Sequence, residues 1–261
     1  MAKQYSKHAL RKIAGLCIKT AKALMASGAE TARVETTVEH IGKACGIPVE
    51  SYATPTGITV TVGKEAPITV VARVKSRTID LAKVIDVNNL SRSLAAGSMA
   101  FQTADKAIDE ISRKPSIYSN TVIYIGQALC CAGFALLLGG GLSSVIPAII
   151  VGALAKYAEI KCSSLPLFLL VFLNAFSVTL FADLCVFLNL GVEHSIIVIA
   201  GIIPLLPGLS LTNALADLVA GELLSGMARL TESTLVAAAL AAGAAVGISV
   251  GQLLTHQGLS V

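Results

Sequence analysis

The residues best suited to chemistry follow a helix-breaking sequence near the carboxyl end of the chain. Pro204 and the pair Pro207-Gly208 interrupt a long apolar run. They remove helical hydrogen bonds, and lipid tolerates the freed carbonyl groups only where these face protein or a wet cavity. We therefore predict a broken helix whose downstream piece begins near Ser210. Its amide end, which has a partial positive charge, would suit a substrate carboxylate.

Polar side chains continue beyond this break at a regular interval. Asn213, Asp217, Gly221, Ser225 and Arg229 are each four residues apart, which on one continuous helix would form a polar ridge. A carboxylate in an apolar segment is costly and is commonly retained to bind a cation, a proton or a polar substrate. Asp217 is therefore the leading candidate for substrate binding or proton coupling. Structural pairing with Arg229 or Asn213, or solvation at the membrane interface, are its alternatives.

The predicted substrate-binding residues are Pro207, Gly208, Ser210, Asn213 and Asp217.

A second carboxylate, Asp183, also lies within an apolar run and is a second candidate for proton coupling. If it is near the outer end of its helix, it would simply reach water. Glu193 and His194 are predicted loop residues, with a pH-sensitive outer mouth as the alternative. The six cysteines show no CxxC or Cys/His ligand spacing. We predict no catalytic residues, metal, disulfide or cofactor.

Charge divides the chain at about residue 116. Residues 1–116 contain 27 of the 36 Asp, Glu, Lys and Arg side chains, and the remaining 145 residues contain nine. The chain is 54% hydrophobic, above the roughly 45 to 50% apolar content of soluble proteins. We predict a cytosolic α+β domain over 1–116 and a transmembrane helical bundle over 117–261. The basic residues are not clustered with aromatic ones, so no nucleic-acid partner is expected.

Hydrophobic periodicity predicts the elements of the first part. Period-two alternation predicts a β-hairpin over about 58–62 and 68–74. Four amphipathic helices are expected around it. They lie at about 8–26, 30–44, 78–96 and 99–113.

The second part is predicted to cross the bilayer about five times. Basic residues flank alternate segments, which places the amino-terminal domain in the cytosol of a cell whose inner or plasma membrane holds the chain. Whether 210–230 crosses, re-enters or lies on the membrane stays open. An odd number of spans without an internal repeat argues for a second copy or a second subunit. The spans are expected at about 118–138, 143–160, 165–188, 195–211 and 233–254.

Several short motifs follow one another along nearly the whole chain. They are Ser27-Gly28-Ala29-Glu30-Thr31 with Arg33-Val34-Glu35, Thr54-Pro55-Thr56-Gly57-Ile58, Asp80-Leu81, Asn88 with Leu90, Pro204-Leu205-Leu206-Pro207-Gly208, Asn213, Asp217, Gly221 and Gly226-Met227-Ala228-Arg229. In this order they resemble the threonine/serine exporter family, specifically its short, YjjP-like members. The resemblance implies gradient-driven export of threonine and serine, or of dicarboxylates such as succinate. It also implies a separate small membrane protein that supplies a second membrane unit.

Together these features predict a subunit of a secondary exporter of small hydrophilic, carboxylate-bearing metabolites, and not an enzyme. Its expected partners are the metabolite, the lipid bilayer and a second membrane subunit or further copies of the chain. Two alternatives stay open. One is a gating or scaffold subunit whose partner contains the path. The other is a membrane-embedded hydrolase using Asp183, His194, Asp217 and Glu222.

Overall fold

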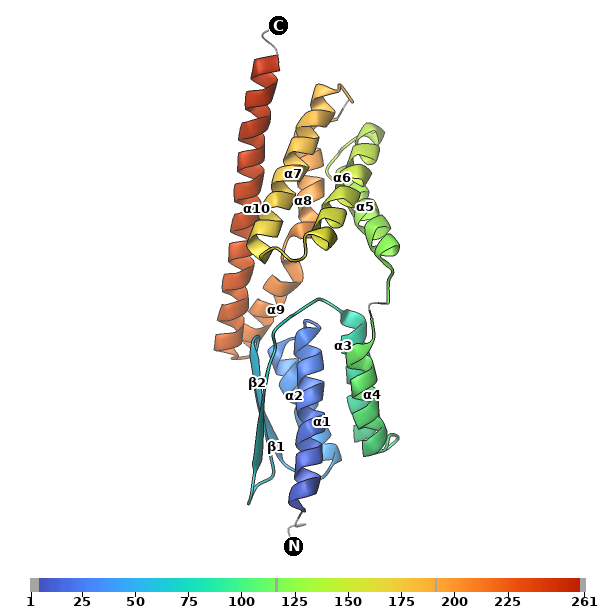
Figure 1. The fold of residues 1–261 in the computed structure, drawn as a ribbon, viewed down its shortest axis with the longest axis vertical. Coiled ribbons are helices and arrows are strands. Elements are labelled where there is room, and N and C mark those ends of the chain that lie inside the picture. The colour runs from blue at the N-terminus through green and yellow to red at the C-terminus, as the bar shows by residue number, and fades with distance from the viewer. Residues whose placement is uncertain (1–4, 116, 191, 259–261) are drawn as a thin grey trace. The chain divides into compact units, whose positions relative to one another are not determined.

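The computed structural model describes residues 5–115, 117–190 and 192–258, with side chains through Leu254. Its elements form two compact units (Figure 1). The first unit contains the described residues up to Ile117 together with Leu209–Leu230. The second contains Tyr118–Gly208 and the described residues from Thr231 onward. Residues 209–230, which the sequence analysis grouped with the membrane part, therefore pack with the amino-terminal elements.

Two amphipathic helices, both predicted from the sequence, form the centre of the first unit. Helix α1 spans Lys7–Ala26 and α2 spans Thr31–Ala44. Their apolar stripes face inward, and residues such as Leu24 and Val34 are fully buried. The connecting turn contains Gly28 at φ 87°, a left-handed conformation that favours glycine.

A three-stranded antiparallel sheet lies on one side of these helices (Figure 1). Strands β2, Gly57–Val62, and β3, Ile68–Arg73, form the predicted hairpin, and Ile58, Val60 and Val62 of β2 are buried. Strand β1, Val49–Thr54, pairs with β2 and was not predicted. Only Val49 and Ala53 of this strand bury apolar side chains, and the residue between them on the same face is the polar Ser51, so the apolar period-two pattern is weak.

Helices α3, Leu81–Ala95, and α4, Phe101–Arg113, lie on the other side of α1 and confirm two further predictions (Figure 1). Asp80 begins α3 by accepting a hydrogen bond from the backbone N–H of Lys83, a typical amino-terminal cap. Helix α4 buries Ala104 and Ile108 against the core of the unit. The first unit is therefore an α+β fold.

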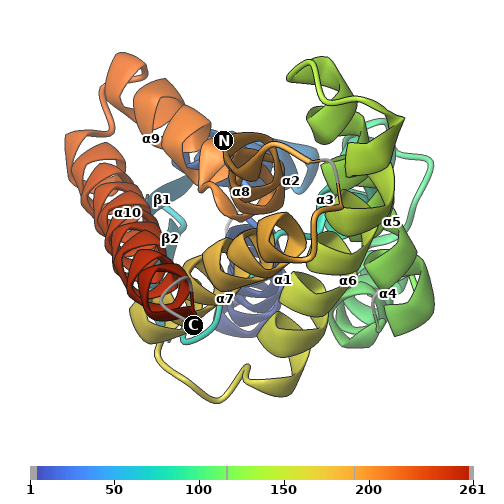
Figure 2. The ribbon, with the colours of Figure 1, turned by 90° about the horizontal axis from the view of Figure 1, so that it is seen from above.

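The second unit is entirely helical in its described part. Among the described residues, four helices are long and apolar enough to cross a membrane, and a fifth span results if the interrupted pair α8/η2 and α9 is counted as one. In Figure 2, α7 lies between α10 and α6. The elements are α5 (Asn120–Leu137), η1 (Leu142–Ser144), α6 (Val145–Lys161), α7 (Leu167–Phe187), α8 (His194–Ile202), η2 (Ile203–Leu205) and part of α10 (Leu223–Gly258).

The predicted helix break is confirmed. Short helix η2 ends at Leu205, Leu206 is extended, and α9 spans Gly208–Val219, two residues earlier than expected. The predicted continuous ridge is wrong, because α9 ends before Gly221, which has a φ of 89°. The chain turns there, and α10 starts at Leu223 instead of near 233. The ridge residues therefore belong to two helices.

Candidate functional site

Asp217 lies at the centre of a buried polar cluster in the first unit. Its side chain is 0% exposed. Oδ1 accepts a hydrogen bond from the backbone N–H of Thr31 at 2.9 Å, and Oδ2 accepts one from the Thr31 hydroxyl at 3.0 Å. Thr31 is the first residue of α2, where backbone N–H groups lack intrahelical acceptors and the helix dipole favours an anion. The carboxylate of Asp217 therefore caps α2 from a distant part of the chain.

Arg229 supplies the counter-ion. Its Nε atom lies 3.1 Å from Oδ2 of Asp217, and the arginine side chain is only 4% exposed. A terminal guanidinium nitrogen donates to the carbonyl oxygen of Ala29 at 2.8 Å and contacts the sulfur of Met25 at 3.3 Å. We call Thr31, Asp217 and Arg229 the Asp217 cluster. It joins α1, the start of α2, α9 and α10 within one unit.

Two further polar residues of the former ridge bind backbone carbonyl groups of the same unit. The side-chain amide of Asn213 donates to the carbonyl oxygen of Gly28 at 2.9 Å, and the hydroxyl of Ser225 donates to that of Ala53 at 3.1 Å. Gly226 lets α10 pack closely against α9, since a Cβ there would lie 2.6 Å from Cγ of Leu218. The segment 209–230 is thus fixed by its polar side chains.

Glu35, on α2, adds a further, partly buried polar contact to this part of the first unit. Its Oε1 accepts a hydrogen bond from the backbone N–H of Ala53 at 2.7 Å, so both polar groups of Ala53 bind side chains. Burial raises the pKa of the Glu35 carboxyl, and the negative charges of Glu222, Glu39 and Asp217 raise it further. Thr31 and Glu35 were not among the predicted site residues, although both lie in the first motif of the family resemblance.

The predicted substrate-binding residues divide between the units. Pro207 and Gly208 belong to the second unit, at the helix break, whereas Ser210, Asn213 and Asp217 belong to the first. Asn213 and Asp217 are brought together with the α1–α2 turn and are buried, whereas Ser210 is half-buried at the start of α9. Their contact with a substrate stays a prediction.

The second proton-coupling candidate, Asp183, is placed in the second unit. It lies on α7, and its Oδ1 is 3.0 Å from Nε2 of His194, the first residue of α8. His194 is therefore helical, which corrects its predicted position in a loop. Glu193 precedes the helix and accepts a hydrogen bond from the hydroxyl of Ser195 at 2.7 Å.

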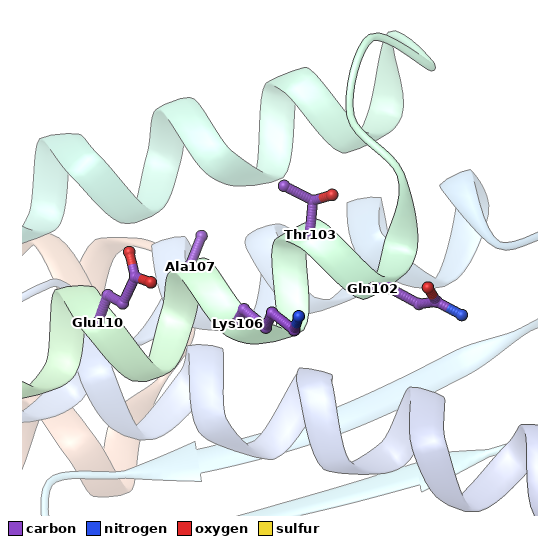
Figure 3. A pocket seen from close by; sticks show the side chains of 5 residues that line it. All are labelled: Gln102, Thr103, Lys106, Ala107 and Glu110. Atoms are coloured by element: carbon purple, nitrogen blue, oxygen red, sulfur yellow. The ribbon is translucent and has the colours of Figure 1, made fainter.

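A surface pocket of about 280 Å³ lies on α4. Figure 3 shows that all its labelled side chains come from this one helix. A binding site usually needs polar groups that converge from several elements, so this pocket does not have the character of a site. Within the described ranges, no group of three or more His, Cys, Asp or Glu residues could hold a metal ion. The pocket is lined by Gln102, Thr103, Lys106, Ala107 and Glu110.

Several apolar spans, one helix broken by proline, and a compact α+β unit define a multi-pass helical membrane protein. Residues 15–251 match the family model ThrE, described as "Putative threonine/serine exporter". The chain belongs to the threonine/serine exporter family.

Individual relatives are similar over almost the whole chain. The "Threonine/serine exporter" of Corynebacterium glutamicum is 27% identical over 93% of this chain and 52% of its own length. The "Probable threonine/serine exporter" of Mycobacterium tuberculosis is 28% identical over 96% of this chain and 47% of its own length. The chain thus spans about half the length of these two relatives.

A shorter relative matches over nearly its whole length. The "Probable succinate transporter subunit YjjP" of Escherichia coli is 25% identical over 92% of this chain and 95% of its own length. No solved structure matches the chain significantly.

Proposed function

We propose that the chain is a subunit of a secondary exporter for small hydrophilic metabolites that carry a carboxylate. The observation that carries this proposal is the break between η2 and α9 in a chain of an exporter family. Interrupted helices commonly form substrate sites in membrane transporters, because the start of the second piece offers unpaired amides and a partial positive charge. The relatives' names supply the candidates threonine, serine and succinate, which share a carboxylate.

In this proposal Pro207, Gly208 and Ser210 form the end of α9 that receives the substrate carboxylate. Asn213 and Asp217 supply hydrogen bonds further along the helix. In the described conformation Asn213 is hydrogen-bonded to Gly28 and Asp217 to Thr31. To contact the substrate, both side chains would have to break these hydrogen bonds and form new ones with the substrate. Substrate binding would thereby be linked to the packing of α9 against the α1–α2 turn.

The setting of the subunit is part of the same proposal. Basic residues flank the segments on one side, which favours a cytoplasmic amino-terminal domain in the cell membrane. The membrane gradient is the energy source that fits, since no nucleotide-binding loop is evident in the sequence. The word "subunit" in the names of the YjjP relatives favours a second membrane protein as partner.

Metabolite profiling of the culture medium tests the proposal. Cells that produce the chain together with its partner should release more threonine, serine or succinate than cells that lack the chain. Unchanged release of all metabolites would contradict the exporter function. Full export by the partner alone would favour a scaffold role instead, and turnover of a lipid or peptide by the purified chain would favour the hydrolase alternative.

A further inference from the structure

The second unit contains a carboxylate–imidazole pair within its apolar helices. Asp183 lies one turn before the end of α7, and His194 is the first residue of α8. Their side chains are 21% and 31% exposed, and Oδ1 of Asp183 lies 3.0 Å from Nε2 of His194. A carboxylate and an imidazole in an apolar setting are costly to retain, which makes the pair a candidate for function.

The other carboxylate oxygen faces a third helix. Oδ2 of Asp183 is buried and has no hydrogen-bond partner among the residues described with side chains. It packs against Gly251 of α10, where a Cβ atom would overlap it. Gly243 and Gly247 continue this close contact of α10 along α7, against Phe172 and Thr179. A change in the charge of Asp183 would therefore act directly on the contacts of α7 with α8 and α10.

We propose that the pair Asp183–His194 binds the proton whose movement drives export. The proposal rests on the exporter function proposed above. The imidazole of His194 has two ring nitrogens that can hold a proton, and one of them, Nε2, faces the carboxylate of Asp183. When the proton leaves, the start of α8 still offers its partial positive charge to the carboxylate. The pair thus changes its net charge from zero to −1, and after the proton has left, the start of α8 partly balances the remaining carboxylate.

The Asp217 cluster is less suited to this role. Protonation of Asp217 would leave the charge of Arg229 buried without its counter-ion, which costs several kcal/mol. Arg229 cannot release a proton instead, because a guanidinium stays charged in proteins. Of the two carboxylates that the sequence analysis named for coupling, Asp183 is therefore the better proton carrier.

Few other titratable groups lie on the elements around the pair. Glu193 precedes α8 and binds the Ser195 hydroxyl, and the side chain of His256 on α10 lies outside the described part. The remaining titratable or charged residues of the packed helices are Tyr124, Cys130 and Cys131 on α5, Lys156, Tyr157, Glu159 and Lys161 on α6, Cys185 on α7, and Arg229 and Glu232 on α10.

Transport in vesicles tests the proposal. The full chain and its partner subunit are reconstituted, and two activities are measured with labelled threonine and succinate. The first is counterflow of substrate at equal pH on both sides, and the second is accumulation driven by a pH gradient. In Asp183→Asn and His194→Gln, the rate of counterflow should stay within about twofold of the wild-type rate. The accumulation driven by the pH gradient should fall about tenfold or more, and a tenfold fall corresponds to about 1.4 kcal/mol of coupling. The matched control Glu193→Gln should behave as the wild type.

A further variant moves the carboxylate without removing its charge. Gly251→Ala should change the pH dependence of transport, because the new methyl group displaces Oδ2 of Asp183 from its place. The melting temperature of each purified variant shows whether it has folded.

The outcomes separate this inference from the exporter function. Wild-type gradient response in Asp183→Asn would overturn the proton site and leave the exporter function intact. If both variants lose counterflow as well as the response to the pH gradient, the pair has a structural role and the proton site is overturned. A wild-type complex that transports without responding to the pH gradient would also overturn the proton site. No transport of either substrate by the wild type would instead count against the exporter function.

Discussion

Replacement of Arg229 by methionine should destabilise the first unit strongly. Methionine has an apolar side chain of length similar to that of arginine, but it lacks the positive charge that Arg229 places beside Asp217. The carboxylate of Asp217 is fully buried. Breaking a buried ion pair by removing one partner costs about 3–5 kcal/mol. The two hydrogen bonds from Thr31 to the carboxylate remain, so we expect a loss near the lower end, about 3 kcal/mol.

This loss can be measured on the purified full-length chain. In a protein of this size, 3 kcal/mol corresponds to a decrease in melting temperature of about 6–12 °C. The backbone amide of Thr31, which donates to Asp217, should also exchange its hydrogen faster. The matched control is Glu30→Gln, because the ion pair of Glu30 with Arg33 is exposed and spans 3.7 Å. That control should cost at most about 1 kcal/mol.

A double variant separates the charge effect from lost packing. Adding Asp217→Asn to Arg229→Met removes the unpaired charge but keeps an oxygen that can accept from the Thr31 amide. The double variant should therefore be more stable than Arg229→Met alone. If Arg229→Met melts within 2 °C of the wild type, with Thr31 equally protected, the reasoning about a buried ion pair is refuted.

Two other substitutions give further expectations. Gly243→Ala should destabilise the second unit by about 1–3 kcal/mol, because a Cβ would collide with the backbone of Phe172, which cannot rotate aside. Gly133→Ala on α5 is its control and should be neutral or stabilising in the same melting experiment, since no atom lies within 4 Å of the new Cβ. For Glu35, burial raises the pKa of the carboxyl above its ordinary value of 4.5. Between pH 4.5 and the raised pKa, the folded chain therefore binds more protons than the unfolded chain. The free energy of unfolding should fall as the pH rises through this range. Glu35→Gln should remove this decline in melting temperature with pH, and a decline that persists in this variant would assign it to another group.

The sequence predicts regular elements well and long-range polar contacts poorly. Helices α1 and α2, the β2–β3 hairpin and the break before α9 follow from hydrophobic period and from proline and glycine, which act over a few residues. The turn at Gly221 was missed, because a single glycine in a helical pattern is compatible with a continuous helix.

The partners of Asp217 were only partly foreseeable. Pairing with Arg229 was among the alternatives, since both side chains fall on one periodic series. The contact with Thr31 joins residues 186 positions apart, and no local pattern encodes such a distance. Similarly, Asp183 and His194 are separated by a helix end and a loop, so their pairing depends on how α7 and α8 pack.

The central claim is that the start of α9 faces water and receives the substrate. Labelling of Leu209→Cys, in a variant whose six native cysteines are replaced, tests it most directly. The account predicts that a water-soluble maleimide reacts at this position, and that threonine, serine or succinate slows the reaction. Leu129→Cys, on the exposed apolar surface of α5, should not react. A cysteine at 209 that stays unlabelled, or that reacts equally with and without every substrate, would contradict the account.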